Sequence, residues 1–272
     1  MEHQGRVRLK DVAAAAGLSS ATVSLILNGM SDRFPPATIV RVRETAEALG
    51  YTPNVAARSL RTNVTHTLGV LTDNILTTSS GYPMIQGMQD AAWERDFLML
   101  FIGVDSDPDR RAKAIAELQA RQVDGLLVGA MYHRSVDVGP LPAGLPTVGY
   151  NAVVPGVACF VPDDRGVGIQ ATQLLVDHGH RRIVHLTEFP TDGLARELRI
   201  QGFEKVLREA GVTEARVHRL ATESRTAPSD VAERAALEIL SGPEPPTAIL
   251  AFTDLFAVGV YRAARQLGVR IP

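Results

Sequence analysis

From Thr67 onward, short apolar runs alternate with amphipathic helical patterns, and this alternation constrains the fold more than any other feature of the chain. Apolar runs without polar alternation are typical of strands buried on both faces of a parallel sheet. The succession of strands and helices therefore predicts an α/β fold, with helices on both faces of one large sheet or of two smaller ones. The predicted strands are Thr67–Leu71, Phe97–Ile102, Gly125–Val128, Pro146–Gly149, Ile183–Leu186 and Thr247–Phe252, with a shorter apolar run at Ala158–Val161. The predicted helices are Met84–Arg95, Asp109–Gln122, Gly168–His178, Arg196–Ala210, Val231–Leu240 and Ala257–Leu267.

The first 61 residues differ from the rest of the chain in pattern and in charge. They show short helical patterns without a strand pattern, and they hold eight Lys and Arg against five Asp and Glu, a net charge of +3. Because the whole chain carries a charge of −2, the remainder carries −5. A small basic module on a larger acidic body suggests a reader of a polyanion such as nucleic acid.

Three features of the sequence bear on where the protein acts. The single cysteine, Cys159, excludes an internal disulfide and favours the cytoplasm. No apolar run reaches the roughly 18 residues of a membrane-spanning helix. The N-terminus lacks the apolar core of a signal peptide. We therefore expect a cytoplasmic protein that has no membrane partner.

Two short helices joined by a tight turn are predicted near the N-terminus. Val12 and Ala16 share one helical face, and Gly17–Ser19 then interrupts the helix. Ser19 is a good N-cap for the next helix, whose apolar face holds Val23 and Ile26 together with Leu27. This unit is a helix-turn-helix, which places the start of its second helix at base edges in the DNA major groove. The residues placed there are Ser20, Ala21, Thr22, Ser24 and Leu25.

These side chains have the chemistry for reading DNA. Their hydroxyl groups can bond phosphates or bases, and Ala21 and Leu25 can contact thymine methyl groups. A third helix is predicted after them, capped by Thr38 and ended by Gly50. Its predicted core residues are Ile39, Val42, Ala46 and Leu49. The stretch 51–61 that follows is too short for a helix stable on its own, so a partner or DNA must order it.

Several spaced motifs in this region resemble the LacI/GalR (lactose-repressor) family of transcriptional regulators. The motifs are Lys10–Ser19, Thr22–Ser24, Asn28–Gly29, Leu49–Tyr51, Pro53–Asn54, Ala57–Arg58 and Leu60. The resemblance continues through the body of the chain, at Val123–Val128, His178–Ile183, Arg199, Gly202–Phe203 and Asp254–Gly259.

The resemblance implies a homodimer that binds a pseudo-palindromic operator in double-stranded DNA. It implies a hinge helix at about residues 54–61, in which Leu60 is the apolar wedge that enters the minor groove and Ala57 lies beside it. Asn28, Asn54 and Arg58 fall in matching motifs and are carried over as DNA-binding residues.

Two positions depart from the family pattern. Leu25 stands where the family often has a guanine-reading arginine, which leaves the operator preference open. Arg8 stands where the family commonly has a threonine cap, and it could either reach a phosphate or remain solvated.

For the body, the resemblance implies a periplasmic-binding-protein type of fold, with two parallel-sheet α/β subdomains and an effector cleft between them. The expected domains are 1–61 (helix-turn-helix and hinge), 62–161 and 162–272. The chain ends just after a helix, so we expect a C-terminally truncated protein whose second subdomain is incomplete.

Effector-binding candidates follow from the general rule that ligands of open α/β sheets lie beyond the carboxyl ends of strands. Residues at such ends are Asp73, Asn74, Asp163, Thr253 and Asp254. Arg199 and Asp254 also match the family's ligand-contacting positions, and a guanidinium with a carboxylate suits a hydroxyl-rich ligand such as a carbohydrate or derivative. The family's aromatic platform is absent or displaced to Tyr82. Arg199 could instead form a surface ion pair. Asp163 and Asp164, which follow the run Ala158–Val161, are better interpreted as helix caps than as ligand contacts, and Asp254 could also be a cap.

We find no set of residues that indicates catalysis, a metal site or a cofactor. Gly166–Ala171 fits a dinucleotide-binding pattern, but Asp163 and Asp164 beside it would repel a pyrophosphate. His178 and His180 are better interpreted as a turn that closes a helix, and Trp93 as a core residue.

The sequence therefore predicts an effector-controlled transcriptional regulator, most simply a repressor, and not an enzyme. A truncated fragment that senses no effector and a sugar-binding protein without DNA function are the alternatives.

Overall fold

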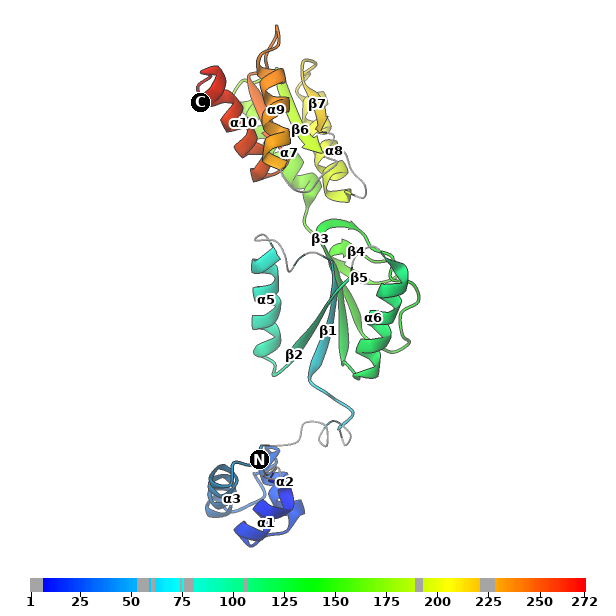
Figure 1. Ribbon diagram of the computed structural model, residues 1–272, viewed down its shortest axis with the longest axis vertical. Coiled ribbons are helices and arrows are strands. Elements are labelled where there is room, and N and C mark those ends of the chain that lie inside the picture. The colour runs from blue at the N-terminus through cyan, green and yellow to red at the C-terminus, as the bar shows by residue number, and fades with distance from the viewer. Residues whose placement is uncertain are drawn as a thin grey trace, which may run out of the picture. The chain divides into compact units, whose positions relative to one another are not determined.

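This computed structural model describes residues 7–52, 59, 62–73, 75, 81–104, 107–188, 193–220 and 228–272. The chain separates into two compact units, Met1–Thr65 and His66–Pro272, each of which is described by itself (Figure 1). Five residues predicted to bind DNA or effector lie outside the described part of the chain, namely Asn54, Ala57, Arg58, Leu60 and Asn74.

The N-terminal unit is a bundle of three helices, α1 (Leu9–Ala16), α2 (Ser20–Leu27) and α3 (Pro36–Ala48). The chain bends by 106° between α1 and α2, which is the geometry of a helix-turn-helix. The core of the unit is small and apolar. Its fully buried residues are Val12, Ala13, Ala16, Val23, Ile26, Val42 and Ala46.

The caps of these helices agree with the sequence in one case and differ in another. The Ser19 hydroxyl accepts a hydrogen bond from the Thr22 N–H at 3.0 Å, which confirms Ser19 as the N-cap of α2. The prediction for Thr38 is wrong, because the N-cap of α3 is Pro35, three residues earlier. The prediction that Leu49 lies in the core is wrong, because Leu49 is the C-cap that follows the last residue of α3 and is 39% exposed.

The body begins with a five-stranded parallel sheet in the order β2-β1-β3-β4-β5. Figure 1 shows α5 and α6 on opposite faces of this sheet. The strands are β1 (Thr67–Thr72), β2 (Leu98–Gly103), β3 (Gly125–Ser135), β4 (Thr147–Val153) and β5 (Ala158–Phe160). The helices are α5 (Tyr82–Trp93) and α6 (Pro108–Ala120).

A second parallel sheet of three strands follows, in the order β7-β6-β8. Val184 and Leu186 on β6 pack towards α9 and α10, whereas Ile183 packs towards α7 and α8. The strands are β6 (Ile183–Glu188), β7 (Arg216–Leu220) and β8 (Ala248–Ala251). The helices are α7 (Asp164–Asp177), α8 (Leu194–Glu209), α9 (Pro228–Leu240) and α10 (Asp254–Leu267). Of the two sheet arrangements left open by the sequence, the chain has the two smaller sheets.

Three features of the body differ from expectation. The strand β7 was missed, because its charged and apolar residues alternate on an edge strand and leave no continuous apolar run. The strand β3 continues well past its predicted end at Val128. The prediction that Trp93 lies in the core is wrong. Trp93 is the last residue of α5, and it is 75% exposed.

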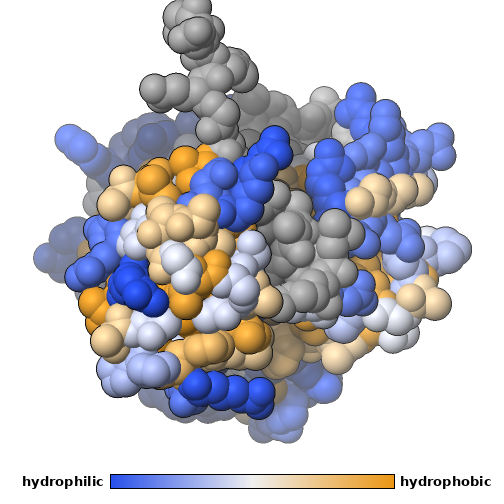
Figure 2. Space-filling model, turned by 90° about the horizontal axis from the view of Figure 1, so that it is seen from below, coloured by the Kyte–Doolittle hydropathy of each residue, from blue (hydrophilic) through white to orange (hydrophobic). Residues whose placement is uncertain are grey.

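Apolar side chains also reach the surface of the N-terminal unit. Met30 and Val40 are each about half exposed, at 50% and 52%. Figure 2 shows hydrophilic and apolar residues interspersed on the face that it views.

Within the described ranges, no single helix is long and apolar enough to cross a bilayer. The bent pair of α1 and α2, taken together, meets these two criteria.

Candidate DNA-reading and effector-binding sites

The start of α2 presents the predicted base-reading side chains at the surface. Ser20 and Ala21 are exposed, whereas Thr22, Ser24 and Leu25 are half-buried. The opposite face of α2 packs into the core of the unit, so the direction of the exposed face is fixed. An exposed helix start held on a rigid three-helix core is the arrangement that helix-turn-helix proteins use to reach base edges.

Two of the predicted DNA-binding side chains are tied to α2 itself. The Asn28 side-chain N–H donates to the Ser24 carbonyl oxygen at 2.6 Å and lies 3.2 Å from the Ser24 hydroxyl. The Thr22 hydroxyl lies 2.9 Å from that of Ser19. These contacts fix side-chain rotamers before any DNA arrives.

Arg8 is the exposed N-cap of α1, and its backbone N–H donates to the Asp11 carboxylate at 2.8 Å.

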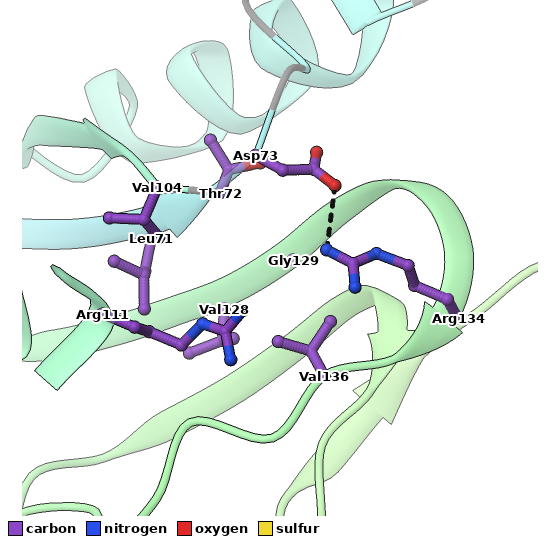
Figure 3. A pocket seen from close by; sticks show the side chains of 9 residues that line it. All are labelled: Leu71, Thr72, Asp73, Val104, Arg111, Val128, Gly129, Arg134 and Val136. Carbon is purple, nitrogen blue, oxygen red and sulfur yellow. Dashed lines mark hydrogen bonds and ion pairs between the residues drawn. The ribbon is translucent and has the colours of Figure 1, made fainter. Parts of the chain in front are cut away.

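At the carboxyl end of β1, Asp73 is bound by the extension of β3. One carboxylate oxygen accepts the Met131 N–H at 2.7 Å, and the other lies 3.2 Å from a guanidinium nitrogen of Arg134. Figure 3 shows this ion pair at the rim of a hollow. The hollow is small, with room for about one water molecule. Its lining residues are Leu71, Thr72, Asp73, Val104, Arg111, Val128, Gly129, Arg134 and Val136.

A tyrosine ring lies directly over Gly129 in this region. A Cβ at Gly129 would lie 2.3 Å from the Tyr150 ring, so glycine is required to leave room for the ring. Burial, and to a lesser degree the nearby Asp73 carboxylate, raises the pKa of Tyr150 to about 12. Tyr82, the displaced aromatic candidate, begins α5, is 65% exposed and donates its O–H to Gln86 at 3.0 Å.

The carboxyl edge of the second sheet brings together Arg199 and the segment that opens α10. One Arg199 terminal nitrogen donates to the Phe252 carbonyl oxygen at 3.0 Å, and the guanidinium lies 4.7 Å from the centre of the Phe252 ring. Thr253, the next residue, is the N-cap of α10 through its hydroxyl, which accepts the Phe256 N–H. The suggestion that Asp254 caps this helix is wrong, because Asp254 is its exposed first residue.

The structure also brings together two buried residues of this region, Asp164 and His133. The sequence offers Asp164 as a helix cap or an effector contact, and the cap interpretation is wrong because Asp163 is the N-cap of α7. His133 was not selected from the sequence. Asp164, only 1% exposed, accepts from the Arg199 Nε–H at 2.8 Å and lies 2.8 Å from Nδ1 of His133. His133 comes from β3, and its side chain is 3% exposed. The neighbouring Asp163 is the exposed N-cap of α7, accepting the Gly166 N–H at 2.9 Å, which confirms the capping interpretation.

The effector-binding residues predicted at the edge of the first sheet make no polar contact with those predicted at the edge of the second, within the part of the chain that the structure describes. Within the described part of the chain, no hydrogen bond or ion pair links Asp73 or Tyr82 to Arg199, Thr253 or Asp254. Among the same described residues, no group of three or more His, Cys, Asp and Glu could hold a metal ion. His178 is the C-cap of α7, which confirms that the histidine pair belongs to a helix-closing turn.

Comparison with known proteins gives two matching families. The family described as "Periplasmic binding proteins and sugar binding domain of LacI family" matches residues 65–272. The family described as "Bacterial regulatory proteins, lacI family" matches residues 8–54. The first match contains the whole of the second unit, and the second match lies within the first unit.

Individual relatives and solved structures agree with these two matches. The ribose operon repressor of Escherichia coli strain K12 is 31% identical over 273 residues, covering 97% of this chain and 79% of the relative. The structure of the lac repressor dimer bound to operator and an anti-inducer superposes with a TM-score of 0.80 at 22% identity, covering 98% of this chain and 79% of that one. The structure of the transcriptional regulator CelR with cellobiose gives a TM-score of 0.60 at 29% identity, covering 98% and 80%.

The helix-turn-helix, the two parallel sheets and the matches over both units lead to one assignment. The chain belongs to the lacI family of bacterial transcriptional regulators.

Proposed function

We propose that the chain is a homodimeric, sequence-specific repressor whose operator affinity is set by a small effector bound between its two α/β subdomains. The observation that carries the DNA-binding part is the start of α2, which is exposed and held in place by the Ser19 cap and the core of the three-helix unit. The proposed domains are residues 1–61, 62–161 and 162–272. Leu60 and Ala57 of the linker are proposed minor-groove contacts, alongside Asn54 and Arg58.

The proposed effector is a carbohydrate or a derivative of one. Arg199 is partly exposed and has guanidinium N–H donors beyond those that bind Asp164 and Phe252, and Asp254 offers an exposed carboxylate at the same sheet edge. Both groups make paired hydrogen bonds with adjacent hydroxyls. One relative is a ribose operon repressor and another was solved with cellobiose, which supports a hydroxyl-rich ligand. The remaining proposed contacts are Asp73, Asn74, Tyr82, Asp163 and Thr253.

The relatives found are transcriptional regulators. The proposal accordingly gives this chain no catalytic step and no cofactor, and places it in the cytoplasm beside the DNA it reads.

Selection of bound sequences from random duplex DNA by the 272-residue chain tests the DNA-binding part. A palindrome should be enriched, with a flexible pyrimidine–purine step at its centre, and the sample should be dimeric. Ala21→Asp places a negative charge at the exposed start of α2 and should abolish enrichment. Ala48→Asp adds the same charge at the exposed end of α3 and serves as the control. Enrichment that survives Ala21→Asp, or no enrichment by the dimeric parent, would refute the proposal.

A further inference from the structure

A chain of charged and polar groups connects the extension of β3 with the carboxyl edge of the second sheet. It starts at His133, passes through the two carboxylate oxygens of Asp164 to the Arg199 guanidinium, and ends at the Phe252 carbonyl oxygen. Both carboxylate contacts measure 2.8 Å. The four residues come from four different segments, so only the folded chain assembles them.

Burial differs sharply along this chain. The side chains of His133 and Asp164 are 3% and 1% exposed, whereas that of Arg199 is 29% exposed. A carboxylate removed from water is stable only when it is paired and hydrogen-bonded, and here each oxygen has one partner. Asp164 therefore serves as a fixed, buried anchor for a guanidinium that still reaches the surface.

The anchoring leaves part of the guanidinium free. Arg199 uses Nε for Asp164 and one terminal nitrogen for Phe252. No partner for its other terminal nitrogen is present among the described residues. A guanidinium has five N–H donors in a rigid fork, so fixing one edge fixes the direction in which the remaining donors point.

We propose that Asp164 and His133 are positioning residues for effector binding: Asp164 orients Arg199, and His133 holds Asp164 in the orientation that this requires. The inference rests on the proposed function, in which Arg199 contacts the effector. An arginine that is already oriented loses little rotamer freedom when the ligand arrives, and that saving appears as affinity. Neither residue touches the ligand in this arrangement; each acts through its neighbour.

Arginine Nε–H resonances of the full ¹⁵N-labelled chain report the orientation directly. The Arg199 signal is identified by its loss in Arg199→Lys. In the parent chain it should exchange slowly with water, since it donates to a buried carboxylate. Asp164→Asn and His133→Ala should each speed this exchange by about 10- to 100-fold, the range expected when a charged hydrogen bond is lost. His133→Asn, which keeps an N–H donor near the position of Nδ1, should restore slow exchange. Asp177→Asn, at the exposed end of α7, is the control.

Calorimetric titration of the same variants with D-ribose and with cellobiose measures the consequence for binding. Affinity for the sugar that the parent chain binds should fall by about 10-fold or more in Asp164→Asn and in His133→Ala, and recover in His133→Asn. Unchanged sugar affinity in both variants, while Arg199→Lys abolishes binding, would overturn the positioning role and leave the proposed function intact. Failure of the parent chain to bind either sugar would count against the proposed sugar effector instead. An Arg199 signal that neither variant moves would overturn the inference by itself.

Discussion

His185 lies on the face of β6 that packs against α7 and α8, and it is 1% exposed. Its ring is tilted against that of Phe203 at a centroid distance of 5.2 Å. Burial, followed by the positive charges of Arg199 and Arg219, lowers the pKa of His185 from 6.5 to about 4. The fold therefore holds this imidazole in its neutral form.

This shift predicts how the stability of the second sheet depends on pH. Between pH 6.5 and about 4, the unfolded chain binds a proton at His185 that the folded chain does not. The free energy of unfolding should therefore decrease as the pH falls, by about 1.4 kcal/mol per pH unit and by about 3 kcal/mol in all. Urea titrations at several pH values measure the slope. His185→Leu should lose this part of it, and an identical slope in the two proteins would contradict the assignment.

At the scale of a single side chain, we expect Leu25 to set part of the operator preference. It is half-buried on α2, at the position where the resemblance to the family often places an arginine. Leucine can contact a thymine methyl group but cannot donate to guanine. In selection from random DNA, Leu25→Arg should gain a guanine at one position of each half-site, worth about 1–3 kcal/mol of discrimination. Leu25→Met keeps an apolar contact and should retain the parent preference. A consensus shared by parent and Leu25→Arg would show that residue 25 does not reach a base.

At the scale of elements, patterns of hydrophobicity were informative wherever an element buries a continuous face. The interior strands β1 and β6 were found because their apolar residues are consecutive. The strand β7 was not, because it reads Arg-Val-His-Arg-Leu and has no two consecutive apolar residues. The start of α3 was misplaced because proline and threonine both begin helices, and the choice between them depends on packing that the sequence does not display.

Close packing of α7 against α8 depends on two glycines. A Cβ at Gly202 would lie 2.4 Å from the Arg165 carbonyl oxygen, and one at Gly168 would lie 2.3 Å from that of Arg199. Both obstacles are backbone atoms, so a side chain can be admitted only if the helices separate. The same packing sets the distance between Asp164 at the start of α7 and Arg199 on α8.

Gly202→Ala should therefore destabilise the body by about 1–3 kcal/mol, the usual cost of overpacking. The control is Gly87→Ala on the exposed side of α5, where an added Cβ meets nothing within 4 Å. That substitution should stabilise the chain by roughly 0.5–1 kcal/mol through helix propensity. Thermal and urea unfolding of both variants measure the difference. Equal stability of Gly202→Ala and the parent would show that the two helices can move apart at no cost.

At the scale of the whole molecule, the sequence predicts which sheet edges carry the candidate sites. It predicts less well which side chains contact one another at each edge. Asp73 and Thr253 were selected because strand ends in parallel sheets converge on one edge, and Arg199 because it matches a ligand-contacting position of the family. The pairing of His133 with Asp164 could not be predicted, since it joins positions 31 residues apart on different elements. Neither residue belongs to a motif. Asp164 also follows Asp163 directly, and only the fold distinguishes the exposed cap from the buried anchor.

Control of DNA binding by an effector is a property of the two units together. If a sugar bound in the body changes the operator affinity, the operator must change the sugar affinity by the same factor, because both reactions close one thermodynamic cycle. Couplings of this kind usually amount to about 5- to 150-fold. We expect equal factors when the operator Kd is measured with and without saturating ribose or cellobiose, and the sugar Kd with and without the selected operator.

Asp164→Asn separates the contributions to this cycle. It should weaken sugar binding but leave the operator Kd of the sugar-free protein unchanged, because α2 and its contacts lie in the other unit. A sugar that binds the parent chain tightly yet leaves the operator Kd the same would mean that the body binds ligand without regulating the three-helix unit. Effector control would then have to be abandoned, even though sequence-specific DNA binding could stand.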